Sequence, residues 1–194
     1  MLALYITHPQ VRIEPDVPVP RWGLSAKGRE RATQAAQADW ARTLKRIISS
    51  DETKAVETAE ILAQASGLTV EVVDGMGEND RSATGFLPPE RFQEAADWFF
   101  AHPTESFRGW ERAVDAQARI VARVEAILND HGTAGPIAFV GHGGVGTLLK
   151  CHLFGLPIAR RHDQPGDGGN LFAFRLEDRS GACDWTAMET WKGF

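Results

Sequence analysis

The sequence predicts a three-layer α/β/α protein in which a mostly parallel sheet is covered by helices on both faces. Short apolar runs of β-favouring residues alternate with amphipathic segments of helical length, which is the pattern of βαβ units. Segments 171–176 and 185–191 show period-two patterning around a turn at 178–181, which indicates a closing antiparallel pair. The 194 residues contain no repeat or linker, so we expect one domain, residues 1–194.

The individual elements follow from local signals. The first strand, Leu2 to Ile6, ends at Thr7-His8-Pro9 because proline cannot continue a central ladder. Three prolines at 15, 18 and 20 exclude a helix from the loop that follows, and Ser25 is the predicted N-cap of a helix that continues to about Arg42. The remaining elements are a strand at 46–50, a helix at 52–65 stopped by Ser66-Gly67, a strand at 69–73, a loop at 74–89, helices at 91–101 and 110–130, a strand at 136–140, a turn at 141–144 and a helix at 145–154.

Composition restricts the classes of function. The formal net charge of −5 argues against binding to nucleic acid or to an anionic membrane surface. Cys151 and Cys183 show neither a CxxC spacing nor a metal-ligand pattern, so we expect reduced, buried thiols. The sequence contains no signal-peptide pattern and no apolar run of about 18 residues, so we expect a cytoplasmic protein without a membrane span.

Two histidines are the main candidates for chemistry. His8 follows a buried strand, where α/β sheets place their active sites, although a loop histidine can also have no role. Segment 141–146, Gly-His-Gly-Gly-Val-Gly, fits the GxGxxG spacing between a strand and a helix, but the region about 20 residues further on lacks the strand and acidic residue of a dinucleotide site. The alternative is that its glycines let a phosphate approach the helix amides, with His142 as a further donor.

Phosphoryl transfer would require cations and an acid near these histidines. Lys54, Arg12 and Arg81 are the candidate cations, and Glu78 or Asp80 is the candidate acid. The alternative is that Lys54 is a solvated residue at a helix start and that Glu78 is an ordinary loop carboxylate. The six histidines show no HxH or HExxH spacing, so we expect neither a metal nor an organic cofactor.

Several segments, in this order along the chain, resemble the motifs of one family. Leu4-Tyr-Ile-Thr-His-Pro resembles a strand that ends in Arg-His-Gly, and segment 22–28 resembles a Leu-Ser/Thr-x-x-Gly helix start. Segment 48–59 is similar to Ser-Ser-Pro-Leu-x-Arg-Ala-x-Gln-Thr-Ala, Met76-Gly-Glu78 to Leu-x-Glu, and segment 139–145 to a second His-Gly motif. The chain thus resembles the histidine phosphatases, or phosphoglycerate mutase-like superfamily.

The resemblance implies a role for each matching residue. His8 would be the nucleophile that becomes phosphohistidine, Glu78 the general acid, and His142, together with Gly143 after it, would bind the phosphoryl group. Lys54 and Thr7 stand where the family has its two phosphate-binding arginines, and Pro9 replaces the motif glycine. Loss of one charge-assisted hydrogen bond costs about 1.5 to 3 kcal/mol. We hypothesise that Arg12 or Arg81 compensates as a phosphate-binding cation.

The resemblance therefore implies a metal-independent phosphomonoester hydrolase that acts on a small phosphorylated substrate, with neither nucleic acid nor membrane as partner. Because the mutase branch of the family is typically longer, we favour a phosphatase over a mutase. The loops at 11–22 and 74–89 would set specificity, and their residues do not identify a substrate. The alternative is an impaired protein of the same fold that binds an anionic ligand or a partner without turnover. The oligomeric state stays open.

Overall fold

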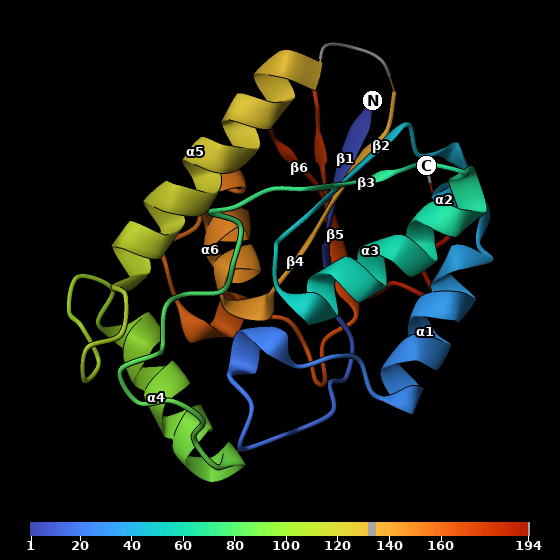
Figure 1. Ribbon diagram of the computed structural model, residues 1–194. Coiled ribbons are helices and arrows are strands. Elements are labelled where there is room, and N and C mark those ends of the chain that lie inside the picture. Colours follow the sequence, from blue (N-terminus) through green and yellow to red (C-terminus); the bar gives the residue numbers. More distant parts are fainter. Residues whose placement is uncertain (132–134, 194) are drawn as a thin grey trace.

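The computed structural model describes residues 1–131 and 135–193 and contains a six-stranded sheet with helices on both faces (Figure 1). The strand order is β3-β2-β4-β1-β5-β6. The bounds are β1 (Leu2–Thr7), β2 (Arg46–Ser49), β3 (Val70–Val72), β4 (Ile137–Gly141), β5 (Asn170–Arg175) and β6 (Gly181–Ala187). Strands β1 to β4 pair in parallel, whereas β5 is antiparallel to both β1 and β6. The predicted fold class and its closing antiparallel pair are confirmed.

Two apolar cores separate the three layers, because alternate residues of each strand face opposite sides of the sheet. Tyr5 of β1 packs with α4 (Pro89–Ala101), α5 (Ala113–His131) and α6 (Gly143–Leu153). Its neighbours Leu4 and Ile6 pack with α1 (Ala26–Ala36), α2 (Asp39–Thr43) and α3 (Thr53–Ser66). Figure 1 shows these two groups of helices on opposite sides of the sheet. Strand β4 is buried along its whole length, as expected for a strand covered on both faces.

The predicted helix from Ser25 to Arg42 is wrong at its centre. Ser25 is the N-cap, since its Oγ accepts the Gly28 N–H at 3.1 Å, but α1 ends at Ala36. Ala38 is extended, and a new short helix, α2, begins at Asp39. This restart buries Trp40, whose ring packs edge-on against Trp191 at 5.6 Å. Apolar spacing alone does not reveal the break, because Trp40 fits both arrangements.

Three smaller predictions are corrected. The proline-rich loop contains one 3₁₀ turn, Val19–Arg21, in which Pro20 lies at the start, where its missing N–H costs nothing. The last strand ends at Ala187 and not at Trp191, because the chain turns there and the Thr190 N–H bonds to the Ala187 carbonyl. Helix α6 begins at Gly143, so Gly143 and Gly144, two of the three glycines in the predicted turn, lie in its first turn, and Gly141 ends β4.

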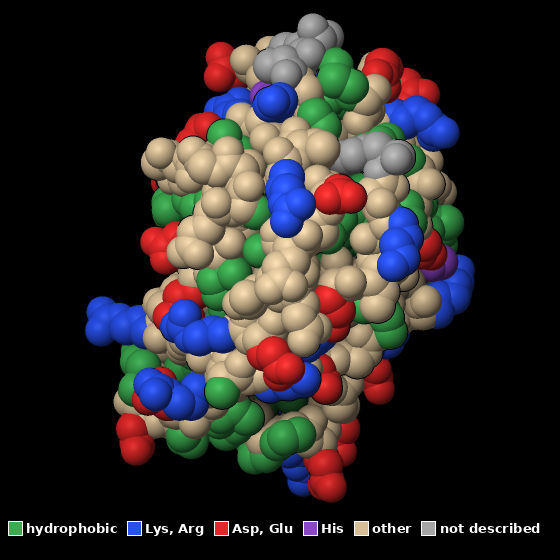
Figure 2. Space-filling view, turned by 90° about the vertical axis from the view of Figure 1, so that its right-hand side faces the viewer, with side chains coloured by type: hydrophobic (Ala, Val, Ile, Leu, Met, Phe, Trp, Pro, Cys, Tyr) green, Lys and Arg blue, Asp and Glu red, His purple; other side chains and the backbone are tan. Residues whose placement is uncertain are grey.

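The molecular surface mixes both charge types. Lysine, arginine and acidic side chains are interspersed on the face seen in Figure 2. Cys151 is buried and Cys183 half-buried, and neither forms a disulfide. Within the described ranges, no helix is long and apolar enough to span a membrane.

Candidate active site

The two candidate histidines meet at the carboxyl edge of the sheet. Strands β1 and β4 are parallel neighbours with Thr7 opposite Gly141, so the residues that follow them leave the sheet side by side. The His8 N–H donates to the Gly141 carbonyl at 2.9 Å. The rings of His8 and His142 lie 5.3 Å apart with an interplanar angle of 67°. Strand register therefore accounts for the closeness of residues that are far apart in sequence.

The ring of His8 is held in one tautomer. Its Nδ1 lies 2.9 Å from the Pro9 carbonyl, which can only accept, so Nδ1 carries the proton and Nε2 keeps its lone pair. Burial, followed by the proximity of His142 and Lys54, lowers the pKa of His8 to about 3. The imidazole is therefore neutral at pH 7. Although Pro9 cannot donate, its carbonyl supplies the contact that orients His8.

His142 is fully buried and is held through both its ring and its backbone. Its Nε2 lies 2.8 Å from Ser50 Oγ, and no described residue hydrogen-bonds to its Nδ1. The Tyr5 hydroxyl accepts the His142 N–H at 3.1 Å and donates to the His142 carbonyl at 3.2 Å. Burial lowers the pKa of His142 despite the nearby carboxylates of Glu52 and Glu78. The site thus contains two neutral imidazoles.

The glycines of the 141–146 segment make room for side chains of this protein. A methyl group added at any of them would lie closer than 3 Å to a neighbouring side chain. The contacts would be with Tyr5 from Gly141 and Gly146, with Gln164 Nε2 from Gly143, and with Glu78 Oε1 from Gly144. Because these side chains occupy the space, the spacing does not support a dinucleotide site.

Glu78 caps the N-terminus of α6. Its carboxylate accepts the N–H groups of Gly144 at 3.0 Å, Val145 at 2.9 Å and Asn79 at 3.1 Å. Burial acts to raise the pKa of Glu78, but Arg81, His142 and the backbone N–H groups outweigh it and lower the pKa below the usual range. Glu78 is therefore ionised at neutral pH, and two of the amides predicted to face a phosphate are already bonded to it.

Lys54 lies in a buried ion pair with Glu52. The Lys54 ammonium donates to Glu52 Oε2 and to the Val19 carbonyl, the latter at 3.0 Å. The other oxygen, Glu52 Oε1, accepts the Glu78 N–H at 2.8 Å and lies 3.4 Å from His142 Nε2. Burial acts to raise the pKa of Glu52, but His142 and Lys54 outweigh it and lower the pKa to about 2. The charge of Lys54 is thus balanced within the site.

The structure places the two predicted compensating arginines differently. Arg81 lies 3.7 Å from Glu78 Oε2, and its guanidinium packs over the rings of Phe92 and Trp110. Arg12 pairs with Glu14 at 3.0 Å and leaves 71% of its side chain exposed. Only Arg81 is therefore brought against the acidic side of the site.

Of the two predicted acids, Glu78 lies at the site and Asp80 does not. The Asp80 side chain accepts the Ser82 N–H at 2.8 Å, as in a local turn. Asp80 is exposed, and its pKa is lowered by this contact with Ser82. Its role is therefore to shape the 74–89 loop.

The predicted specificity loops meet each other. Trp22 of the first loop and Phe86 of the second have ring centroids 5.5 Å apart. The first loop also contacts Lys54, because the Val19 carbonyl accepts a hydrogen bond from the Lys54 ammonium. Both loops are therefore anchored next to the ion pair.

Sequence reasoning missed two residues of the site, Glu52 and Gln164. Glu52 stands inside a quoted motif where the family has Leu, and this departure was the available signal. Gln164 accepts a hydrogen bond from Thr7 Oγ1 at 2.6 Å, although 157 residues separate the two. No local pattern around Gln164 indicated that contact.

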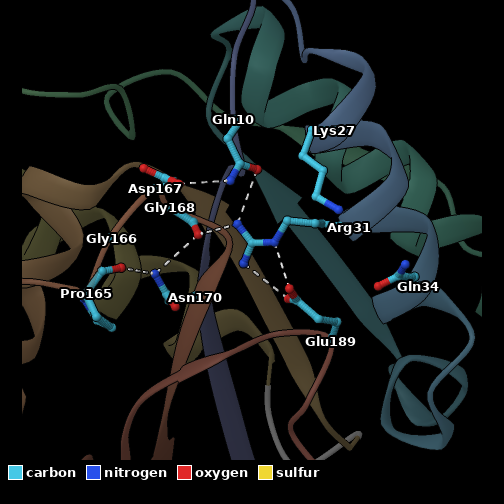
Figure 3. Close-up of a pocket in the computed structure, with 10 residues that line it drawn as sticks. All are labelled: Gln10, Lys27, Arg31, Gln34, Pro165, Gly166, Asp167, Gly168, Asn170 and Glu189. Carbon is cyan, nitrogen blue, oxygen red and sulfur yellow. Dashed lines mark hydrogen bonds and ion pairs between the residues drawn. The ribbon is translucent and has the colours of Figure 1, made fainter.

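A separate pocket of about 430 Å³ lies beside this centre (Figure 3). At its middle, the Arg31 guanidinium bonds to Glu189 at 2.7 Å, to Gln10 at 3.2 Å and to the Gly168 carbonyl at 2.9 Å. Because these acceptors engage Arg31, the pocket offers no free arginine for an anion. Its contacts instead fix the 164–170 loop.

No metal site is evident in the described stretches, 1–131 and 135–193. Among their side chains, no group of three or more His, Cys, Asp and Glu residues is arranged to hold a metal ion.

The fold and the paired histidines at the carboxyl edge are typical of proteins that transfer phosphoryl groups through histidine. The chain matches the sequence profile of the histidine phosphatase superfamily (branch 1) over residues 10–187 and belongs to that family. The match begins two residues after His8, so it does not include the Thr-His-Pro stretch.

Named relatives agree with this assignment. The chain is 30% identical over 152 residues to a glucosyl-3-phosphoglycerate phosphatase of Mycolicibacterium vanbaalenii, covering 70% of this chain and 64% of that protein. It is 31% identical over 154 residues to one from Mycobacterium tuberculosis, covering 70% and 66%. The chain thus matches slightly less than two thirds of these relatives' length.

Among solved structures, a mycobacterial glucosyl-3-phosphoglycerate phosphatase in complex with inorganic phosphate superposes with a TM-score of 0.79 at 22% identity, over 98% of this chain and 99% of that one. Bacillus stearothermophilus YhfR gives a TM-score of 0.77 at 18% identity, over 96% and 98%. These likenesses show the shared fold.

Proposed function

We propose that this protein hydrolyses phosphomonoesters through a phosphohistidine at Nε2 of His8. The observation that carries the proposal is the geometry of the histidine pair: the two rings are adjacent, and the contact of His8 Nδ1 with the Pro9 carbonyl leaves the lone pair of His8 Nε2 free. A neutral imidazole with a free nitrogen is a competent nucleophile. Its placement at the carboxyl edge of β1 agrees with a catalytic role.

The reaction would proceed in two displacements. His8 Nε2 attacks phosphorus, and the bond between phosphorus and the ester oxygen breaks as that oxygen takes a proton. Water then attacks the phosphohistidine, the P–N bond breaks, and phosphate leaves while His8 returns to its neutral form. His142 would contact the phosphoryl oxygens during both displacements.

Glu78 would exchange the protons. Because its pKa is lowered, most of it is ionised at neutral pH, a state that suits removal of a proton from the attacking water. Its protonated form, needed to assist a poor leaving group in the first displacement, becomes more abundant as the pH falls. Alkyl phosphates should therefore depend on Glu78 more strongly than aryl phosphates do.

The relatives suggest the first substrate to test. Two of them are named glucosyl-3-phosphoglycerate phosphatases, so a small phosphorylated sugar acid is our candidate class. Contact between Trp22 and Phe86 gives the two specificity loops an aromatic junction. Trp22 is buried in this contact and Phe86 is exposed, so a sugar ring would pack on Phe86.

A rapid-quench experiment tests the function. Incubation with ³²P-labelled substrate should leave acid-labile, base-stable label on the wild-type protein, and His8→Ala should abolish both this label and the release of phosphate. A matched control is His102→Ala, since His102 is exposed and stacks on Trp98 outside the site. Labelling that survives in His8→Ala contradicts the assignment of the nucleophile.

A second function has one specific observation in its favour. The Glu52 carboxylate is already bound to Lys54, which reduces the positive charge available to stabilise a phosphoryl-transfer transition state, and this suits a protein that binds a ligand or a partner without turnover. Phosphate binding without label, at every pH from about 5 to 8, would support this alternative.

A further inference from the structure

The amide of Gln164 lies between the neighbours of both histidines. Its Oε1 accepts from Thr7 Oγ1 at 2.6 Å, and Thr7 directly precedes His8. Its Nε2 would be only 2.3 Å from a Cβ added to Gly143, which directly follows His142. The side chain therefore extends from the end of β1 to the start of α6, beside the histidine pair.

The hydrogen-bond network determines which end of this amide is nitrogen. Asn170 Nδ2 faces the carbonyls of Pro165 at 2.9 Å and Gly168 at 3.3 Å, and only a donor can satisfy two carbonyls. The same Nδ2 lies 3.1 Å from the amide of Gln164, so the Gln164 atom that faces it must be the oxygen. The nitrogen of Gln164 therefore points toward Gly143, and no described residue accepts a hydrogen bond from it.

The segment that carries Gln164 is held against the site. The Asp163 carboxylate accepts the Gln164 N–H at 2.8 Å and the Thr147 hydroxyl at 2.7 Å, which ties the segment to α6. The Gly169 N–H donates to the His8 carbonyl at 3.0 Å, which ties the segment to β1. A donor fixed in this way needs little reorganisation to meet a ligand.

We propose that Gln164 binds the phosphoryl group by donating a hydrogen bond from Nε2 to one of its oxygens. This inference rests on the proposed function, because it assumes that the phosphoryl group lies between His8 and His142. At the position of one family arginine this chain has Thr7, which carries no charge. The neutral Gln164 amide beside Thr7 supplies a hydrogen-bond donor there without adding charge. Gln164 is thus a binding residue that the family motifs do not contain.

Two substitutions of Gln164 distinguish donation of a hydrogen bond to the ligand from a role in packing alone. Gln164→Met keeps the side-chain volume and removes the donor without adding charge. Gln164→Glu keeps an oxygen that can accept from Thr7 and Asn170 but replaces the donor by a second oxygen. We expect both variants to lower kcat/KM for p-nitrophenyl phosphate at least about 10-fold at pH 7.5, and to weaken orthovanadate binding by a similar factor.

The matched controls are Gln34→Met and Gln34→Glu, at a glutamine of α1 that lies on the rim of the pocket in Figure 3. We expect them to stay within about twofold of wild type in both measurements. Gln164→Glu and the two Gln34 variants should keep the wild-type unfolding temperature, whereas Gln164→Met removes the acceptor for Thr7 and Asn170 and should lower it by about 2 to 4 °C. A space-filling role would leave Gln164→Glu close to wild type, because its Thr7 and Asn170 contacts persist.

The outcomes distinguish this inference from the proposed function. If wild type turns over substrate and both Gln164 variants stay within about threefold of it, the inference is overturned and the function stands. If wild type forms no phosphohistidine, the function fails, and the dissociation constants for vanadate alone decide the role of Gln164. Wild type that neither turns over substrate nor binds vanadate overturns both.

Discussion

The two positions that match the family's arginines are built in opposite ways. On the Thr7 side, a hydroxyl, the Gln164 amide and the Asn170 amide form a network without charge. On the Lys54 side, a cation is present, but Glu52 is bonded to it and is itself buried. One side has thus lost its charge, whereas the other has kept a charge and balanced it.

This difference shows that two routes lead to the same electrostatic result. An arginine offers a planar fork of donors with a permanent charge, which suits a phosphate dianion. Here the donors near the histidines are mostly neutral, and each carboxylate of the site, Glu52 or Glu78, has a basic side chain beside it. We therefore expect weak binding of phosphate dianion and a larger dependence on individual hydrogen bonds.

The largest expected effect is on stability and arises on the Lys54 side. Lys54→Met leaves the Glu52 carboxylate buried without its cation, which should lower the free energy of unfolding by about 3 to 5 kcal/mol. The double variant Lys54→Met/Glu52→Leu should recover most of this loss, because neither charge remains. Urea denaturation measures the free energy of unfolding of both variants. The control is Lys27→Met, at an exposed position of α1. A loss below about 1 kcal/mol in Lys54→Met would show that the pair is not buried as described.

The next effect concerns anion binding. Glu52→Gln keeps an oxygen for the Glu78 N–H and removes the charge that balances Lys54, so phosphate affinity should rise about 10-fold or more. Isothermal titration calorimetry with inorganic phosphate measures this change in affinity. The control is Glu60→Gln, at an exposed position of α3. This variant makes the same change in net charge and should bind phosphate like wild type. Equal gains in both variants would mean that overall charge, and not release of Lys54, is responsible.

A pH dependence of stability is expected from the histidine pair. The folded pKa of His8 is lowered from 6.5 to about 3, so the unfolded chain binds a proton that the folded protein excludes. Stability from this residue is present above pH 6.5 and is lost as the pH falls toward 3, by about 1 kcal/mol between pH 6.5 and 5.5. Denaturation at these two pH values should therefore show a smaller decrease for His8→Gln than for wild type. An identical decrease would place the titration elsewhere.

The sequence was informative where structure repeats locally. Strand and helix periodicity predicted the order of the elements. Because active sites of α/β sheets lie at the carboxyl ends of strands, the sequence also predicted that His8 and His142 lie at the same site. The break at Ala38 was not predictable, because burial of Trp40 against Trp191 depends on packing between distant segments.

The two missed residues of the site, Gln164 and Glu52, were missed for different physical reasons. The contact between Thr7 and Gln164 joins β1 to an irregular loop, and an irregular loop has no periodicity from which its position can be inferred. Glu52 was visible in the sequence, but its partner Lys54 was assessed as a lone cation. Whether a lysine is free or paired depends on side-chain geometry that a motif does not contain.

The last expected effect lies on the neutral side, where it is smaller than on the Lys54 side. Thr7→Val preserves the shape of the side chain and removes a hydroxyl that donates to Gln164 and accepts the Asn170 N–H at 3.0 Å. No charge is left unpaired, so the free energy of unfolding should fall by only about 1 to 2 kcal/mol and phosphate affinity by about threefold. Thr7→Ser keeps the hydroxyl and should lose less than half as much stability. If Thr7→Val costs as much as Lys54→Met, the neutral network is as important to the fold as the buried ion pair, and the contrast between the two sides does not hold.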